Sequence, residues 1–169
     1  MIIMFWILTA AFIVIDRLTK AAAESNIKGS EIIRVLTAGD TDILAFSLHR
    51  NTGAAFSSFT GKTVALAIVT AVALVLITIY FHRQKHKHPL MTVSYAMIVG
   101  GGIGNLIDRV FQGYVTDFIR LFPFDFIFNF ADICVVIGAI LLIIYYIFID
   151  EKYMKKAAPE NDSEVKNDK

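Results

Sequence analysis

Two long stretches of this chain carry no charged residue, one at 63–81 over 19 residues and one at 90–107 over 18 residues. Each approaches the roughly 20 residues that a helix needs to cross a hydrocarbon layer about 30 Å thick. Their apolarity is continuous rather than alternating, which favours helices over barrel strands. Since 56% of all residues are hydrophobic and the mean hydropathy is +0.62, we expect an integral membrane protein.

The other long apolar segments complete a set of four membrane-spanning helices. Their expected bounds are 3–22, 63–81, 90–109 and 131–149. We interpret residues 1–153 as a single membrane domain. The remaining segment, 154–169, mixes charges with almost no large apolar side chains and is expected to be a disordered cytoplasmic tail.

The first span could instead be a cleaved signal peptide, because the sequence AAA at 21–23 imitates a small-residue cleavage site. However, no positive side chain precedes the apolar stretch, and Asp16, Arg17 and Lys20 lie between it and that site. A signal peptide should stay uncharged there. We therefore favour a retained helix.

The positions of lysine and arginine predict the orientation of the four spans. The short connection after the second span holds Arg83, Lys85 and Lys87, and the fourth span is followed by Lys152, Lys155 and Lys156. Positively charged connections stay in the cytoplasm. Both termini are then cytoplasmic, and the connections 24–62 and 110–130 face the outside.

The two outer connections are not featureless. In the first, EIIRVL (31–36) and DILAFSLHR (42–50) are typical of short strands separated by the turn TAGDT. The second, GYVTDFIRLFPFDFIFNF (113–130), is rich in aromatic and β-branched residues. It is expected to form extended structure on the membrane surface, where aromatic side chains are enriched.

Two ionisable residues, Asp16 and Lys20, lie within the first span, where such residues are costly. Their spacing of four places them on one helix face, where they could pair. Alternatively, both side chains reach the headgroup region and need no partner. The sequence leaves these two interpretations open.

The third span ends in GGGIGNLIDR, in which Gly100 and Gly104 have the spacing that lets another helix approach closely. The polar residues that follow share one face of the helix and are Asn105, Asp108 and Arg109. The pattern indicates either a packing groove with a polar end or a polar network that supports a site at the outer boundary. The second interpretation is favoured.

Two aspartates, Asp117 and Asp132, flank the aromatic outer connection. If Asp132 opens the fourth helix, it can cap that helix, where a carboxylate accepts backbone N–H groups and meets the helix dipole. Asp117 could be an ordinary surface residue. Neither aspartate identifies a function by itself.

Other chemistries have weaker support. The single cysteine, Cys134, excludes an internal disulfide; a pair with His49 stays open, although a lone buried cysteine is usually a small hydrophobe. Three histidines lie in the short connection between the second and third spans, His82, His86 and His88. They fit a solvated turn better than a metal site. There is no zinc, P-loop or Rossmann spacing. The net charge of +1 gives no reason to expect nucleic-acid binding.

Read in order, five motifs resemble those of the lipoprotein signal peptidases (signal peptidase II), a bacterial family of membrane aspartyl proteases. They are DRLTK (16–20), RNTGAAFS (50–57), GGGIGNLIDR (100–109), VTDFI (115–119) and FNFAD (128–132). No motif position departs from the family pattern in a way that would put activity in doubt.

The resemblance implies that Asp117 and Asp132 are the catalytic pair. It implies supporting roles for Asp16, Lys20, Asn51, Gly53, Asn105, Asp108, Arg109, Asn129 and Ala131. It also implies an all-α membrane fold of four transmembrane helices with a small extracytoplasmic β platform, a mobile flap, and a place in the bacterial cytoplasmic membrane.

The implied substrates are prolipoproteins, cut on the N-terminal side of a cysteine that carries a diacylglyceryl group. Two close carboxylates cannot both ionise cheaply, so one can activate water while the other, protonated, binds the carbonyl oxygen. No metal or cofactor is then required. Membrane lipids and prolipoproteins are the expected partners, nucleic acid is not, and a monomer is expected. The glycines at 100, 101, 102 and 104 could leave room for lipid or the substrate helix.

Two other classes of protein compete with this interpretation. A small transporter or ion-conducting bundle could line a polar path with its charged residues, but these gather at one side and give no continuous path. A structural membrane subunit could use the aspartates as helix caps.

Overall fold

The computed structural model describes residues 1–39, 41–53, 61–122 and 126–150, and it contains four long helices. Their bounds are α1 Ile2–Asn26, α2 Gly61–Arg83, α3 Pro89–Phe111 and α4 Phe130–Phe148. All four are long and apolar enough to cross a membrane, and their bounds lie within a few residues of those expected for the four spans. The predicted tail at 154–169 lies outside the described residues.

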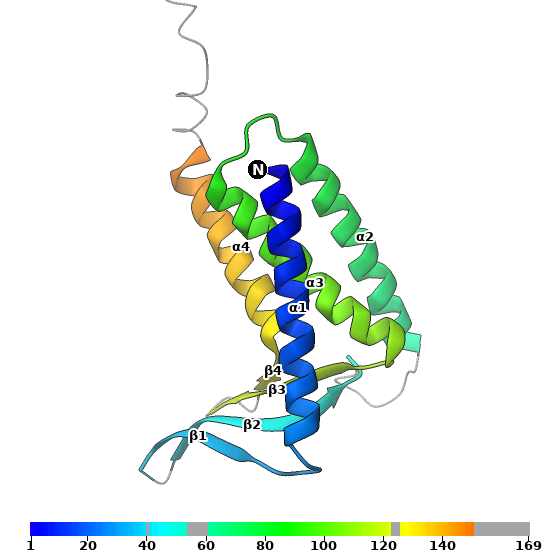
Figure 1. The fold of residues 1–169 in the computed structure, drawn as a ribbon, viewed down its shortest axis with the longest axis vertical. Coiled ribbons are helices and arrows are strands. Elements are labelled where there is room, and N and C mark those ends of the chain that lie inside the picture. Colours follow the sequence, from blue (N-terminus) through cyan, green and yellow to red (C-terminus); the bar gives the residue numbers. More distant parts are fainter. Residues whose placement is uncertain (40, 54–60, 123–125, 151–169) are drawn as a thin grey trace, which may run out of the picture.

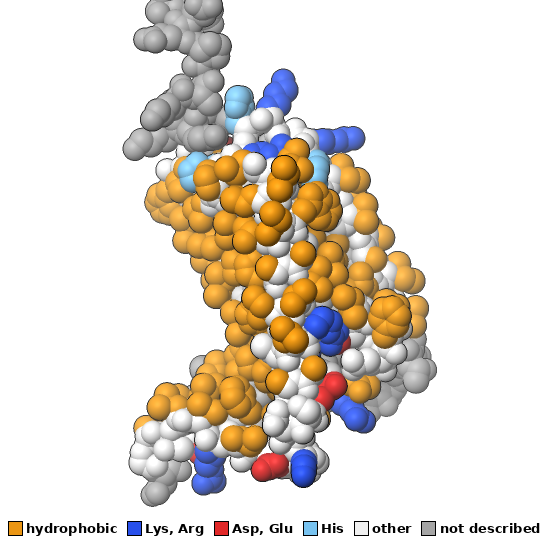
Figure 2. Space-filling model, in the orientation of Figure 1, with side chains coloured by type: hydrophobic (Ala, Val, Ile, Leu, Met, Phe, Trp, Pro, Cys, Tyr) orange, Lys and Arg blue, Asp and Glu red, His pale blue; other side chains and the backbone are white. Residues whose placement is uncertain are grey.

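Helix α3 forms the centre of the bundle and packs against α1, α2 and α4 (Figure 1). Over half of its most apolar window is buried, 56% against 11% in α2, so the other helices turn most of their apolar side chains outward. Figure 2 shows the result, an apolar belt with charged side chains gathered at its two ends. A soluble protein rarely exposes so large an apolar surface, whereas a protein that spans a bilayer presents apolar side chains to the lipid.

The small residues of α3 allow its neighbours to approach closely. A Cβ at Gly100 would lie 3.0 Å from the backbone oxygen of Thr9 in α1, and one at Gly104 would collide with Asp16. A Cβ at Gly101 would meet the backbone of α4. The packing role predicted from the glycine spacing is therefore confirmed. The expectation that these three glycines leave room for lipid or substrate is wrong, because the protein's own helices fill the space.

A four-stranded antiparallel sheet covers the end of the bundle where α1 finishes (Figure 1). In spatial order its strands are β1 Ile33–Ala38, β2 Thr41–Asn51, β3 Val115–Leu121 and β4 Phe126–Phe128. This sheet confirms the predicted β platform and the extended structure of the second outer connection.

The predicted bounds of the first hairpin need correction. The strand starts at Ile33 rather than Glu31 and continues to Ala38, which pairs with Thr41. The five-residue turn expected at 37–41 therefore shortens, because its ends are drawn into the hydrogen-bonded ladder. Parts of both outer connections, 54–60 and 123–125, lie outside the described residues, so the flap stays a prediction.

Candidate active site

Four charged residues from α1 and α3 form a cluster below the sheet in which only Arg17 is partly exposed; we call it the charge cluster, and its members are Asp16, Arg17, Lys20 and Asp108. The Lys20 Nζ lies 2.9 Å from Asp16 Oδ2 and 2.8 Å from Asp108 Oδ2, and all three side chains are fully buried. Arg17 donates to the other oxygen of Asp108. The alternative in which Asp16 and Lys20 reach the headgroups is therefore wrong. Two carboxylates and two cations balance one another, which makes burial of the cluster tolerable.

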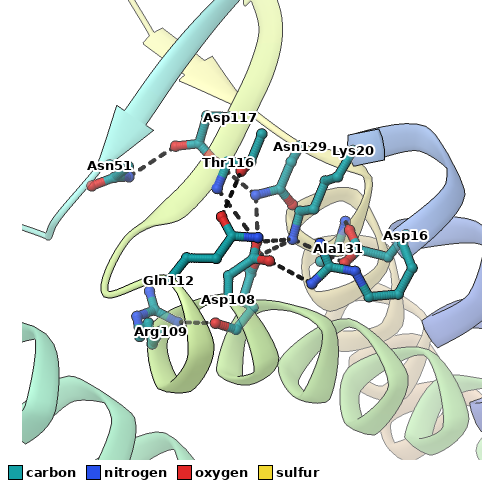
Figure 3. Close-up of polar contacts among 12 residues, drawn as sticks. Asp16, Lys20, Asn51, Asp108, Arg109, Gln112, Thr116, Asp117, Asn129 and Ala131 are labelled. Carbon is teal, nitrogen blue, oxygen red and sulfur yellow. Dashed lines mark hydrogen bonds and ion pairs between the residues drawn. The ribbon is translucent and has the colours of Figure 1, made fainter. Parts of the chain in front are cut away.

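Two hydrogen bonds connect the charge cluster to α4 and to β3 (Figure 3). Asp16 Oδ1 accepts the backbone N–H of Ala131 at 3.2 Å, which anchors the first turn of α4 to α1. Asp108 Oδ2 accepts the backbone N–H of Thr116 at 3.3 Å, which anchors β3 to α3. These bonds place the start of α4 and the start of β3 next to each other. Those two segments carry Asp132 and Asp117.

Asp117 lies in β3, is 1% exposed, and is held by two amide side chains. Asn51 Nδ2 donates to its Oδ2 at 2.9 Å, and Asn129 Nδ2 donates to its Oδ1 at 2.6 Å. Burial raises the pKa of the Asp117 carboxyl above its ordinary value, the bond from Asn51 partly offsets this, and the negative charge of Asp132 raises it again. Asp117 is thus the carboxyl that binds a proton more readily than a free aspartate does.

Asp132 lies in the first turn of α4 but does not occupy the predicted N-cap position. The N-cap is Asn129, whose side-chain oxygen accepts the Asp132 N–H at 3.0 Å. Asp132 occupies the third helical position, and its Oδ2 accepts the Asn129 N–H at 3.1 Å, which completes a capping box. Asp132 was correctly predicted to stabilise the start of α4, but the predicted N-cap position was wrong. Asn129, three residues earlier, is the N-cap.

Asn105 continues the network from the charge cluster to Asp132. Its Oδ1 accepts from Lys20 at 2.9 Å and from Asn129 Nδ2 at 3.1 Å, while its own Nδ2 donates to Asp132 Oδ1 at 2.8 Å. Because Lys20 can only donate, the Asn105 amide is held with its NH₂ towards Asp132. The orientation of this carboxylate is therefore set by α1, α3 and α4 together.

Asp132 also opens onto an apolar cavity of about 780 Å³ between α2, α3 and α4, which we call the interhelical groove. Representative lining residues are Val69, Leu74, Gly102, Asn105, Asp132 and Val136. Arg109 lines it as well, and its Nη1 lies 3.4 Å from the Asn105 carbonyl oxygen. Asn105, Asp108 and Arg109 were predicted to share one polar network, and the contacts agree, because Lys20 joins Asp108 to Asn105 and Arg109 donates to the Asn105 carbonyl oxygen. Within this network Asp108 is turned to α1 and Arg109 to the groove.

The remaining predicted residues support the backbone around the site. The Gly53 N–H donates to Asn51 Oδ1 at 2.8 Å, and its φ of +72° is one that a residue with a side chain rarely adopts. Gly104 makes room for Asp16, and Ala131 is fully buried where its N–H binds that carboxylate. All twelve predicted site residues therefore lie in or beside one network at the end of the bundle that the sheet covers.

Cysteine and histidine chemistry finds no support in the geometry. Cys134 is 1% exposed inside α4, whereas His49 is exposed on β2. His82 packs its ring against Phe5, and His88 caps α3 by accepting the Leu90 N–H. Among the described residues, no three His, Cys, Asp or Glu side chains are grouped as metal ligands.

Three residues with clear roles in the network were not predicted. Arg17 pairs with Asp108, and the Thr116 hydroxyl donates to Glu24 Oε1 at 2.7 Å. Arg17 and Thr116 each adjoin a predicted residue, Asp16 and Asp117, and that adjacency was the available signal. Glu24 had none, because its contact joins the end of α1 to a strand 92 residues away.

Two carboxylates bound by one asparagine lie at the mouth of an apolar groove in a four-helix membrane bundle, an arrangement that suits a membrane hydrolase of the aspartic class. The comparisons with known proteins agree. A family model described as signal peptidase (SPase) II matches residues 8–148. The chain belongs to the signal peptidase II family, and it is a multi-pass membrane protease that removes signal peptides in lipoprotein maturation.

The similarity extends over nearly the whole chain. The lipoprotein signal peptidase of Clostridium acetobutylicum is 35% identical over 150 residues, which cover 86% of this chain and 95% of that one. That of Staphylococcus aureus is 34% identical over 164 residues, covering 95% and 94%. A solved structure described as a bacterial membrane enzyme has a TM-score of 0.77 at 31% identity, covering 86% and 93%. The family resemblance and the fold class predicted from sequence are confirmed.

Proposed function

We propose that Asp117 and Asp132 are the catalytic pair and that they hydrolyse a prolipoprotein on the N-terminal side of its diacylglyceryl-modified cysteine. One observation carries the assignment. Asn129 donates its side-chain N–H to Asp117 and its backbone N–H to Asp132, so a single residue holds both carboxylates at one place. Proximity is what aspartic chemistry requires, because close carboxylates titrate as a pair and share a proton.

The surroundings of the two carboxylates suggest how they divide the work. Asp117 is buried and has a raised pKa, so it holds the shared proton. Asp132 is partly exposed at the groove, and it accepts a backbone N–H at the N-terminus of α4, where the helix dipole stabilises negative charge. Asp132 is thus the carboxylate that accepts a proton from water.

The reaction then proceeds with the protons balanced. Asp132 takes a proton from water as the water oxygen attacks the scissile carbonyl carbon, and Asp117 gives its proton to the carbonyl oxygen. When the tetrahedral intermediate collapses, Asp132 passes its proton to the leaving amine nitrogen. Asp117 recovers a proton from the intermediate's hydroxyl group, which becomes the product carboxyl oxygen. The pair returns to its starting state.

The charge cluster supports this chemistry without touching the substrate. Lys20 fixes Asn105, Asn105 orients Asp132, and Asp16 fixes the backbone of α4 next to it. A catalytic group held by several elements loses little freedom when the substrate binds. We assign positioning roles to Asp16, Lys20, Asn105 and Asp108.

We propose that the interhelical groove holds the apolar part of the substrate. Its lining is almost entirely aliphatic and aromatic, and Asp132 lies at one end of it. A substrate helix in this groove would bring its cleavage site to the water boundary. The acyl chains of the modified cysteine can remain in lipid or against the groove wall.

We further propose that the site faces the outside and that both termini are cytoplasmic. The supporting feature is the short α2–α3 connection, which carries Arg83, Lys85 and Lys87 at the end of the bundle opposite the sheet (Figure 1). Positively charged short connections are retained in the cytoplasm.

The test compares Asp117→Asn and Asp132→Asn with wild type on a purified diacylglyceryl-modified precursor, with a metal chelator present. Each variant should lose at least about 10²-fold in cleavage rate, which is the contribution of a positioned acid or base. Asp42→Asn is the matched control, because Asp42 lies in the same sheet and pairs with Arg34 away from the site. Full activity in either dyad variant would refute the assignment. Cleavage that chelator abolishes would refute the metal-free mechanism.

A further inference from the structure

The interhelical groove does not stop at the active site but continues along the same three helices towards the cytoplasmic end. A second apolar cavity of about 390 Å³ lies between α2, α3 and α4 and is lined by Leu76, Tyr80, Tyr95 and Leu142, among others. Ile98 lines both cavities. Because both contact Ile98, the two cavities adjoin, and we call the pair the channel.

Three tyrosines, one from each of these helices, lie at the far end of the channel. Tyr95 Oη of α3 lies 3.2 Å from Tyr146 Oη of α4, and Tyr146 Oη lies 3.4 Å from Tyr80 Oη of α2. The Tyr80 and Tyr95 ring centroids are 6.2 Å apart. This tyrosine bridge joins α2 to α4 across the channel.

An ordinary interfacial tyrosine directs its hydroxyl to water and headgroups. Tyr95 differs, because it is 4% exposed and its hydroxyl is directed across the bundle to Tyr146. In a hydrocarbon environment a hydroxyl without a partner is costly, so the three hydroxyls stabilise one another and the bridge resists opening. Tyr80 and Tyr146 are 51% and 39% exposed, so the bridge spans the gap between α2 and α4 at the lipid-facing side, with only Tyr95 buried behind it.

The position of the bridge sets a length. Asp132 and Tyr146 lie fourteen residues apart along α4, which corresponds to about 21 Å of helix. A substrate helix lying parallel to α4, with its cleavage site at Asp132, has room for about 14 residues before it reaches the bridge. Signal-peptide apolar regions contain about 7–15 residues, whereas an ordinary transmembrane helix needs about 20.

We propose that Tyr80, Tyr95 and Tyr146 close the channel and limit the length of the apolar helix that the enzyme accepts. The inference rests on the proposed function, since it concerns the substrate of the same site. The bridge makes these tyrosines specificity-determining residues: they admit the short apolar region of a signal peptide and exclude the longer helices of resident membrane proteins. The chemical class selected is a lipidated peptide with a short apolar helix.

The experiment uses two diacylglyceryl-modified peptides that are identical around the cysteine and carry apolar segments of about 12 and about 20 residues. The enzyme is reconstituted in lipid bilayers, and kcat/KM is measured for both peptides. Wild type should strongly prefer the short peptide. The double variant Tyr80→Phe/Tyr146→Phe removes both hydrogen bonds of the bridge and should raise kcat/KM for the long peptide by up to about 30-fold, the factor that two lost hydrogen bonds of about 1 kcal/mol each represent. Its kcat/KM for the short peptide should stay within about twofold of wild type.

Tyr145→Phe is the matched control, because it removes a neighbouring hydroxyl that binds Asp150 rather than the bridge. It should leave the preference unchanged. Leu142→Trp should shorten, rather than lengthen, the apolar helix that the channel accepts. It adds bulk to the channel wall before the bridge, so it should lower cleavage of the 12-residue peptide relative to one with about 8 apolar residues.

The failures of the two proposals are distinguishable. If wild type cleaves the short and long peptides equally, or if the double variant leaves their ratio unchanged, the length limit is wrong while the proposed function stands. Loss of short-peptide cleavage in the double variant would also contradict the length limit, because it would show that the bridge only maintains the fold. If wild type cleaves neither peptide, the proposed function itself fails.

Discussion

Asn129 and Asp132 bind each other reciprocally: the Asn129 side-chain oxygen accepts the Asp132 N–H, and the Asp132 carboxylate accepts the Asn129 N–H. This capping box begins α4 and at the same time fixes one carboxylate of the proposed catalytic pair. The amide NH₂ of Asn129 remains available and donates to Asp117. One asparagine thus couples the start of a membrane helix to the geometry of the proposed dyad.

The two duties of Asn129 can be separated by substitution. Asn129→Ser should keep the cap, because serine caps helices about as well as asparagine, whereas Asn129→Ala should lose about 1 kcal/mol of stability. Both variants leave the buried Asp117 carboxyl without this donor, which costs about 1–3 kcal/mol, so both should lose about 5- to 100-fold in kcat. Thermal unfolding and single-turnover cleavage report the two effects. A serine variant with wild-type kcat would contradict the positioning role.

The raised pKa of Asp117 predicts how stability changes with pH. A carboxyl whose pKa is higher in the native state stabilises the fold while it is protonated, and this contribution is lost as the pH rises through the native pKa. The window therefore begins near the ordinary value of 3.8 and extends upward. Asp117→Asn stays neutral throughout.

In detergent, the Tm of wild type should accordingly fall relative to that of Asp117→Asn as the pH is raised through this window. The two proteins should converge at acid pH. A Tm difference that is constant with pH, or that changes in favour of wild type as the pH rises, would show that burial does not disfavour the charged form of Asp117.

The close contact between Gly104 and Asp16 predicts a severe effect from one added methyl group. In Gly104→Ala the new Cβ would lie 2.9 Å from the Asp16 carboxyl carbon, which cannot retreat without breaking its bonds to Lys20 and Ala131. Overpacking of this kind costs about 1–3 kcal/mol, and activity should fall with it.

Gly102→Ala is the matched control for Gly104→Ala. It lies in the same helix and gains the same helix propensity, but its Cβ would meet the flexible end of Leu74. Tm measured for both variants should fall clearly only for Gly104→Ala. Equal Tm values would mean that Asp16 has room to move.

The ion pair between Arg17 and Asp108 should contribute to stability although Arg17 is partly exposed. Removing it in Arg17→Ala leaves one oxygen of a fully buried carboxylate without its charged donor, which should cost about 1.5–3 kcal/mol. Arg34→Ala is the comparison, because the Arg34–Asp42 pair is exposed and should contribute only about 0–1 kcal/mol. Chemical denaturation in a bilayer-mimetic detergent measures both. Equal losses would show that the charge cluster has no special role.

The four helices could be predicted from sequence because membrane spanning depends on local composition. A charge-free run of about 20 residues has few alternatives in a bilayer. The strand at 42–50 was predicted for a similar reason, since its alternation is local. Bounds were less accurate at Glu31 and Thr41, where pairing with a neighbouring strand decides which residues join the ladder.

The site was predicted through the order of five motifs, and the reasons for its residues became visible only in three dimensions. Spacing suggested that Asp16 and Lys20 pair, but not that Asp108 joins them from 88 residues away. Spacing also grouped Arg109 with Asp108, yet the two point to different neighbours, because α1 and the groove lie on different sides of α3.

The sequence by itself determined that this protein lies in a lipid bilayer, and it determined the four spans and the family. Each of these is encoded in short contiguous stretches. Only the tertiary structure decided that Asn129 rather than Asp132 caps α4, that Gly100, Gly101 and Gly104 receive helices rather than lipid, and that three tyrosines from three helices meet. These outcomes depend on contacts between residues that are distant in the chain. No local pattern specifies them, since the packing of the bundle sets which side chains face one another.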